Sequence, residues 1–297
     1  MLDFTTLFVN VDDCWKAFEK IYTKHLIEDG TRNRNRKNNL STSEIMTILI
    51  AFQTSGYRTF KSFYQYLLTY HRCDFPDLVS YDRFVYLIPR AIIPLLVYLH
   101  VCGIDKPTGI SFIDSTAIKV CHTKRISRNR VFDGIAQIGR TTMGWFFGFK
   151  LHLIINELGG LLGFRLTAGN VDDRCVVEKM TDGLFGKLFG DKGYISQSLF
   201  EKLLAKGVKL VTGMRANMKN RLMELEEKIL LRKRSLIETV NDTLKNVCQI
   251  EHSRHRNPLN FLAHLVAGLV AYTGLPKKPS LKIENVGCRV GEFCLPD

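Results

Sequence analysis

Apolar residues recur at spacings of three and four through the first hundred residues, and no run there alternates strictly between apolar and polar positions. This pattern is typical of packed helices. We therefore predict an all-helical N-terminal domain over residues 1–103. A stretch with two glycines and a proline at 103–109 interrupts the pattern and marks the predicted domain border.

The best-defined helix start is at Ser41, which Glu44 follows three residues later. A serine N-cap and a glutamate at the third helical position satisfy each other's backbone amides in a capping box. We predict one helix over 42–54 and a second over 59–70. Such a pair is either a helix-turn-helix that contacts DNA or an ordinary helical hairpin, and the pattern leaves both interpretations open.

The pattern changes after residue 109, where short β-prone runs precede an alternation of helices and strands. The predicted strands are 110–119, 147–155, 161–167, 187–190 and 208–211, and the predicted helices begin near 173, 197 and 222. Locally paired strands followed by helical crossovers imply a mixed sheet flanked by helices. We predict an α/β fold with a ribonuclease H-like catalytic domain over 104–275, built on a five-stranded mixed sheet, and a C-terminal tail over 276–297.

Amino-acid composition indicates which class of partner the protein binds. The chain of 297 residues carries 42 Lys and Arg against 29 Asp and Glu, a formal net charge of +13, and 45% of it is hydrophobic. A folded basic protein favours a polyanionic partner because each neutralised phosphate releases counterions. Nucleic acid is the expected partner, and a basic enzyme unrelated to nucleic acid is the alternative.

The sequence also predicts no membrane partner and no zinc. The longest apolar stretch, 259–275, falls short of the roughly 20 residues that span a bilayer, so we interpret it as a core helix. The eight cysteines form no C-x-x-C pair, and the chain start lacks the basic and apolar regions of a signal peptide. We expect reduced thiols and a cytoplasmic protein.

Three carboxylates stand where a metal-dependent nuclease would need them. Asp114 interrupts a β-prone apolar run, Asp191 ends a short strand between glycines, and Glu238 lies on the predicted helix from 222 to 246. A carboxylate near a core is costly unless a cation pairs with it. Each also has a plain alternative: an exposed strand face, a turn-forming Asp, or an exposed ion-pair face on a helix.

Neighbouring residues add to this set. Arg234 and Lys245, four before and seven after Glu238, would share its helix face at about 100° per residue. Glu251 is a rival third carboxylate. His152, inside a predicted strand, is expected to be a buried structural histidine.

Two basic runs, 124–130 and 252–256, flank the predicted site elements, and a third lies at 32–37. Lys124, Arg125, Arg254 and Arg256 are the candidates for contacts to DNA phosphates. A solvated charged face is the alternative.

Three carboxylates suit Mg²⁺, and Mn²⁺ as a substitute, because both ions prefer oxygen ligands. Two such ions about 3.5–4 Å apart could activate the attacking oxygen and stabilise the leaving oxygen in phosphodiester cleavage.

The motifs resemble those of bacterial insertion-sequence transposases with a DDE triad, most closely the insertion-sequence 982 family, from 105 to about 283. The similar segments are Phe-Ile-Asp-Ser-Thr at 112–116, Gly-Phe-Lys-Leu-His-Leu at 148–153, Gly-Asn-Val-Asp-Asp at 169–173, Gly-Asp-Lys-Gly-Tyr at 190–194 and Glu-His-Ser-Arg-His-Arg at 251–256. The spacing of Arg234, Glu238 and Lys245 matches a signature of related DDE transposases. That signature has a tyrosine where this chain has Leu231, so the resemblance carries no hairpin-handling tyrosine.

The resemblance implies a fold like that of ribonuclease H and retroviral integrase, in which Asp114, Asp191 and Glu238 bind two Mg²⁺ ions. Arg234 and Lys245 would hold phosphates. Water would cut the end of the element, and the freed 3′-hydroxyl would attack target DNA. The partners would be double-stranded element ends and target, bound by a homo-oligomer associated with the bacterial nucleoid. The alternatives are a nuclease or resolvase of the same fold, and an inactive DNA-binding protein.

Overall fold

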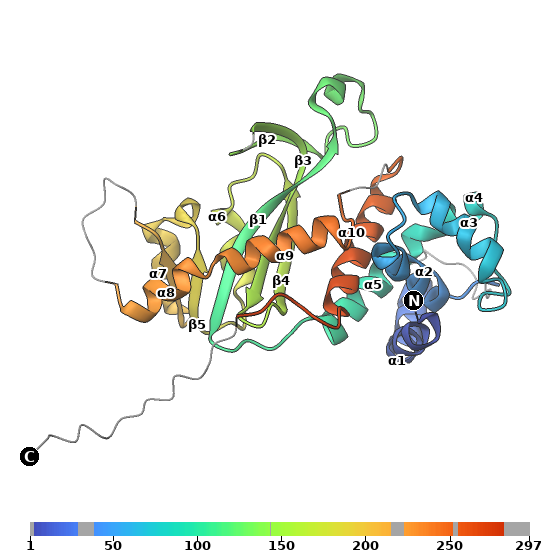
Figure 1. Ribbon diagram of the computed structural model, residues 1–297, viewed down its shortest axis with the longest axis horizontal. Coiled ribbons are helices and arrows are strands. Elements are labelled where there is room, and N and C mark those ends of the chain that lie inside the picture. The colour runs from blue at the N-terminus through green and yellow to red at the C-terminus, as the bar shows by residue number, and fades with distance from the viewer. Residues whose placement is uncertain (1–2, 29–38, 143, 215–222, 252–254, 282–297) are drawn as a thin grey trace, which may run out of the picture.

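The computed structural model describes residues 3–28, 39–142, 144–214, 223–251 and 255–281 (Figure 1). The predicted basic loop at 32–37, Arg254 and most of the predicted tail lie outside the described residues.

The described elements before the sheet are all helical. They are α1 (Phe4–Glu28), α2 (Thr42–Thr54), α3 (Phe60–Tyr70), α4 (Tyr81–Leu87), η1 (Ile88–Ala91), α5 (Ile92–Tyr98) and η2 (Leu99–Gly103). The predicted capping box is confirmed: the Ser41 hydroxyl accepts from the Glu44 amide at 3.1 Å, and the Glu44 carboxylate accepts from the Ser41 amide at 2.7 Å. Both helices of the predicted hairpin therefore form, and α2 is buried on nearly every side.

The sheet contains six strands rather than the five predicted. They are β1 (Ile110–Cys121), β2 (Gln137–Thr141), β3 (Gly144–Asn156), β4 (Leu161–Ala168), β5 (Gly186–Gly190) and β6 (Val208–Thr212), with the order β2-β3-β1-β5-β6. β2 and β4 pair with the same edge of β3 at different ends, and these pairings and β1–β3 are antiparallel. β5 joins β1 and β6 in parallel. The sheet is mixed, as the order of elements predicted.

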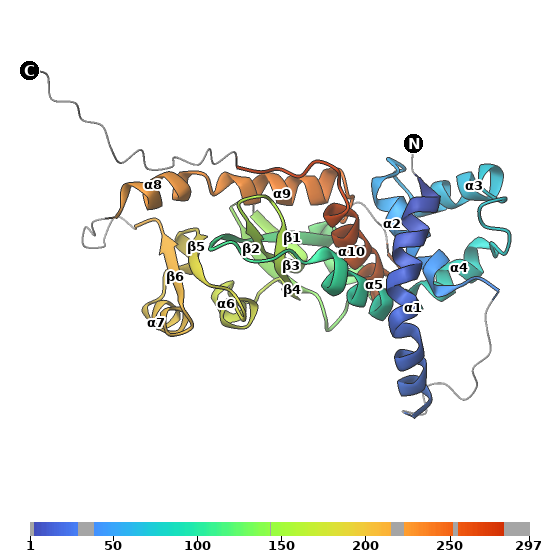
Figure 2. The same ribbon diagram turned by 90° about the horizontal axis from the view of Figure 1, so that it is seen from below.

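Helices cover both faces of the sheet. The remaining elements are η3 (Thr123–Arg128), α6 (Arg174–Met180), η4 (Lys192–Tyr194), α7 (Gln197–Ala205), α8 (Leu225–Arg232), α9 (Ser235–Asn246) and α10 (Pro258–Thr273). Figure 2 shows α8 and α9 along one face and α6 and α7 on the other. The α6/α7 face holds a separate small core around Ile113, Val177 and Leu203.

The predicted helix from 222 to 246 is broken. α8 ends at Arg232 and α9 begins at Ser235, with Lys233 and Arg234 as their adjoining caps. Arg234 therefore stands at the N-cap of α9 and not within a continuous helix.

α10 returns the chain to the N-terminal helices. Gln53 Nε2 on α2 lies 3.2 Å from His264 Nδ1 on α10, and Asn260 Nδ2 donates to the Val85 carbonyl at 3.2 Å. Almost all of α10 is buried in the core that it shares with α2 and α5. The predicted border near residue 103 coincides with the end of η2, and the division into three parts stays a prediction.

The stretch Tyr81–Gly103 is long and apolar enough, by length and composition alone, to cross a membrane. Its side chains Leu87, Leu95 and Leu99 are at most 2% exposed, in the same core as α2 and α10. Burial in a protein core accounts for part of this composition, since 44% of the apolar window is buried.

Candidate active site

Asp114 lies in the middle of β1 with its side chain on the face that α9 covers. It pairs in register with Leu153 of β3, whereas Ala117, three residues on, pairs with Lys150. Because side chains alternate along a strand, Asp114 and Lys150 point to opposite faces of the sheet. The Asp114 side chain is 21% exposed.

Asp191 follows β5 directly and lies beside Asp114 in the sheet. The pair Phe112 and Phe189 comes two residues before each carboxylate on the parallel strands β1 and β5. The Asp191 Oδ1 accepts from the Gly193 amide at 2.8 Å. A Cβ at Gly193 would lie 2.8 Å from that oxygen, so glycine permits this tight turn.

Glu238 projects from the first turn of α9 and is paired with Arg234. The Arg234 Nη2 donates to the Glu238 carboxylate at 2.7 Å, and Nη1 lies 3.9 Å from Asp114 Oδ1. Glu238 is 56% exposed and Arg234 is 24% exposed. The arginine predicted to hold phosphates thus stands between two carboxylates of the predicted triad.

The charge of Asp114 is only partly compensated. Burial raises its pKa to about 6, the Arg234 guanidinium opposes this rise, and the charges of Asp191 and Glu238 add to it. A buried carboxylate with two more carboxylates near it has a marked electrostatic demand for a cation.

The structure allows a direct test of whether these residues could hold Mg²⁺. Among the described residues, no three His, Cys, Asp or Glu side chains converge closely enough to hold an ion. The donor chemistry nonetheless fits, since the charges of Asp191 and Glu238 both act on Asp114 and oxygen donors are those that Mg²⁺ prefers. Convergence on an ion would require the Arg234 guanidinium to leave its position between Asp114 and Glu238.

Lys245 ties α9 to the middle of β1. Its Nζ donates to the Ala117 carbonyl at 2.7 Å and lies 3.2 Å from the Glu251 carboxylate. Glu251 also accepts from the Lys119 amide at 3.3 Å. Glu251, the rival third carboxylate, is therefore held by Lys245 beside Lys119, which is five residues after Asp114 on β1.

The predicted phosphate-binding residues are dispersed. Lys124 and Arg125 are exposed on η3, just past the end of β1 at Cys121. Cys121 comes seven positions after Asp114 along the strand, which is about 23 Å at 3.3 Å per residue. Arg256 is exposed, and its charge acts on Tyr81 of α4.

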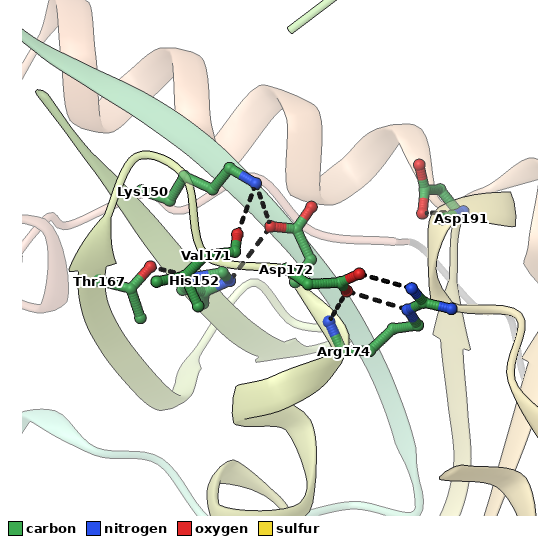
Figure 3. A network of polar contacts seen from close by, with 9 residues as sticks. Lys150, His152, Thr167, Val171, Asp172, Arg174 and Asp191 are labelled. Atoms are coloured by element: carbon green, nitrogen blue, oxygen red, sulfur yellow. Dashed lines mark hydrogen bonds and ion pairs between the residues drawn. The ribbon is translucent and has the colours of Figure 1, made fainter. Parts of the chain in front are cut away.

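A second polar cluster lies on the opposite face of the sheet (Figure 3). Lys150 donates to the Val171 carbonyl and to Asp173, both at 2.9 Å, and His152 Nε2 lies 2.9 Å from Thr167 Oγ1. His152 is fully buried, and burial lowers its pKa to about 4, so the ring is neutral at pH 7. It is the structural histidine that the sequence predicted.

The same view shows Asp172 turned to Arg174, with Asp191 beyond them at the end of β5 (Figure 3). Arg174 Nη2 and Asp172 Oδ2 are 2.5 Å apart, and this partner lowers the Asp172 pKa to about 2. The charges of this cluster therefore already have partners within the protein.

Sequence reasoning missed one residue at the site. Asn241 is buried on α9, and its Nδ2 donates to Asp114 Oδ2 at 3.1 Å. It stands three residues after Glu238 and four before Lys245, so the helical spacing already placed it on their face.

Comparison with known proteins gives a family and a fold. The profile of the family described as "Transposase DDE domain" matches residues 104–258, more than half of the chain. Among solved structures, the chain is similar to the piggyBac transposase in a cryo-EM structure of its synaptic complex with hairpin DNA. The TM-score is 0.50 at 11% identity, over 80% of this chain and 68% of that one. At this identity the similarity concerns the fold. No curated protein matches the chain.

Proposed function

The chain belongs to the transposases that carry a DDE domain, and from this premise we propose that it cuts and joins DNA at the ends of an insertion sequence. Asp114, Asp191 and Glu238 are the proposed triad. The observation that carries this assignment is the Asp114 carboxyl, buried on β1 with its pKa raised and subject to the charges of both other acids.

The proposed fold is ribonuclease H-like. It is supported by three antiparallel strands, β1, β3 and β4, followed by β5 and β6 in parallel with β1. In this arrangement one acid stands on the first strand, one at the end of a neighbouring parallel strand, and one on a helix that covers the sheet.

The three carboxylates would hold the divalent ions, Mg²⁺ or Mn²⁺, two in number. Such ions lower the pKa of an attacking water and stabilise a leaving oxygen. Asp114 would supply the buried charge and Asp191 an exposed one at the strand end. The Arg234 guanidinium would exchange its contact with Glu238 for a DNA phosphate, since arginine binds carboxylates and phosphates with the same donors.

The finer assignment concerns the substrate. We propose that a homo-oligomer of this chain binds the terminal inverted repeats of an element similar to the elements of the insertion-sequence 982 family. Exposed basic side chains at Lys124, Arg125 and Arg256 support a nucleic acid partner. The N-terminal helices are proposed to recognise the ends or to assemble the complex, and α3 supports this with an exposed Lys61.

The test is Mg²⁺-dependent cleavage and strand transfer on labelled DNA that carries the element's end, with wild type and Asp191→Ala at the same salt concentration. Asp182→Ala is the matched control. Asp182 is an exposed acid that follows α6, and its carboxylate pairs with Lys206 at 2.7 Å. We expect wild type and Asp182→Ala to cut and join, and Asp191→Ala to do neither.

Other results would favour the alternatives. Cleavage without preference for the repeat and without joining would indicate a nuclease or resolvase. DNA binding with no metal-dependent product from wild type would indicate an inactive DNA-binding protein. Cleavage that survives in Asp191→Ala would refute the triad.

A further inference from the structure

Asn241 is the one buried amide that touches a carboxylate of the proposed triad within the described chain. It lies on α9 with 7% of its surface exposed. Burying an amide costs free energy unless hydrogen bonds replace those to water, so such a residue usually has a specific partner. Here the partner is Asp114, whose Oδ2 accepts from Asn241 Nδ2 at 3.1 Å.

This contact separates the two oxygens of Asp114. Oδ2 accepts from Asn241, whereas Arg234 Nη1 lies 3.9 Å from Oδ1, beyond ordinary hydrogen-bond length. The Ser115 backbone amide also hydrogen-bonds the carboxylate, and neither it nor the Asn241 amide carries a charge. An amide donor differs from a lysine or arginine at the same place because it fixes the carboxylate without cancelling its charge. Asp114 is thereby held in one orientation while it keeps its attraction for a cation.

The other end of the Asn241 amide is without a partner. Its Oδ1 is buried, and no hydrogen-bond donor reaches it from the described residues. A buried acceptor left unsatisfied costs about 1–3 kcal/mol. Exchanging the amide atoms would not relieve this, because Oδ1 would then face the Asp114 oxygen and two acceptors would repel.

Fixing α9 to the sheet does not by itself account for Asn241. Lys245, four residues on, already joins α9 to the Ala117 carbonyl of β1 at 2.7 Å. An apolar residue at 241 could fill the same space without a buried orphan oxygen. An oxygen of this kind beside an under-compensated carboxylate is instead suited to a divalent ion or a water bound to one.

We propose that Asn241 is a positioning residue of the metal site: its amide nitrogen fixes Asp114, and its carbonyl oxygen faces the ion's coordination shell. This inference rests on the proposed function of the triad. Asn241 itself carries no step of the reaction.

The test uses thermal unfolding of the full chain without DNA, with and without Mn²⁺, since an ion that binds the folded state raises the melting temperature. The variants are Asn241→Leu and Asn241→Asp. Asn246→Leu and Asn246→Asp are matched controls, because Asn246 is on the same helix, exposed, and bonded to Asp242.

For Asn241→Leu we expect Mn²⁺ affinity to fall about 10- to 100-fold, as for other residues that orient metal ligands, and the Mn²⁺-induced rise in melting temperature to shrink. For Asn241→Asp we expect lower stability without metal, because two carboxylates meet, and a larger Mn²⁺-induced rise than in wild type. A purely structural residue would change stability equally with and without Mn²⁺.

The inference is overturned if Asn241→Leu shows the wild-type Mn²⁺ response, or if Asn241→Asp gains no more from Mn²⁺ than Asn246→Asp does. Asp114→Asn separates this failure from that of the proposed function. If Asp114→Asn abolishes the Mn²⁺ response and Asn241→Leu does not, only the role of Asn241 is refuted. If wild type itself gives no response without DNA, the role proposed for Asn241 is refuted, and the cleavage and joining assay decides the proposed function separately.

Discussion

Each face of the central sheet holds a partly buried carboxylate, but only the carboxylate under α6 has a cation at hydrogen-bond distance among the described residues. Under α6, Lys150 and Asp173 form a pair at 2.9 Å with side chains 15% and 30% exposed. Under α9, the nearest cation to Asp114 among the described residues is Arg234 at 3.9 Å, and burial raises the Asp114 pKa to about 6. Buried charge that is paired supports the fold, whereas buried charge left partly unpaired is a reason to expect a ligand.

The largest effect should come from Asp114→Asn. We expect cleavage and joining to fall by about 10³-fold or more, since support of the ions is worth several kcal/mol and each 1.4 kcal/mol is tenfold in rate. The metal-free protein should meanwhile become more stable at pH 8. The Asp114 pKa is raised on folding, so its contribution to stability is present below pH 4 and is lost as pH rises through 6.

Urea unfolding of metal-free wild type and Asp114→Asn at pH 4 and pH 8 checks the stability part of this prediction. The free energy of unfolding of Asp114→Asn should exceed that of wild type by about 3 kcal/mol at pH 8 and by little at pH 4. A variant less stable than wild type at pH 8 would mean that Arg234 and Asn241 fully compensate the charge.

The paired face should respond in the opposite way. Lys150→Met leaves Asp173 partly buried without its cation, and we expect the free energy of unfolding to fall by about 2–3 kcal/mol. Metal-dependent cleavage by the protein that remains folded should change little. Urea unfolding measures the first quantity, with Lys179→Met as control because Lys179 is exposed on α6. An equal loss in both variants would contradict the comparison.

Acid should also act through the paired face. The His152 pKa is lowered to about 4 by burial, so the neutral ring stabilises the fold above pH 6.5, and this contribution is lost as pH falls toward 4. The part due to His152 between pH 7 and pH 5 is about 2 kcal/mol. His152→Gln should reduce the acid sensitivity measured by urea unfolding at both pH values. His100→Gln, at an exposed position, is the control and should leave it unchanged.

The smallest effect is expected for substitutions on η3, which lies away from the polar clusters on both faces of the sheet. Lys124→Ala and Arg125→Ala on η3 should each lower the slope of log affinity against log salt by about 1, uniformly across DNA sequences. Fluorescence anisotropy over a salt series measures it. Lys202→Ala is the control, since Lys202 pairs with Glu178 at 3.0 Å. Unchanged slopes would favour the solvated charged face.

Local signals explain what the sequence predicted. The Ser41 and Glu44 capping box is complete within four residues, and the predicted bounds of α2 match the structure. Asp114 and Asp191 lie on β1 and directly after β5 because apolar, β-prone residues surround them. These features depend on neighbours in the chain, and periodicity records such neighbours.

The features that the sequence did not predict depend on contacts between residues far apart in the chain, which residue spacing does not reveal. The break at Lys233 and Arg234 has no glycine or proline to announce it. β2 was missed because its pairing is set by the extra length of β3 and not by an apolar pattern of its own. Spacing did not predict that Lys245 donates to a backbone carbonyl 128 positions away, and its contact to phosphates stays a prediction. Asn241 has a recognisable role only once β1 and α9 are side by side.

The packing of α10 against α2 has a consequence for how the chain is made. α2 ends at Thr54 and its partner α10 ends at Thr273, so 273 − 54 = 219 residues separate their completion. At about 5–20 residues per second, a ribosome needs some 10–45 s to supply the second helix. Through that interval the nascent N-terminal helices expose the surface of a core whose last component has not yet been synthesised. A chain that stops before Pro258 keeps that surface exposed, and it becomes a substrate for chaperones and proteases.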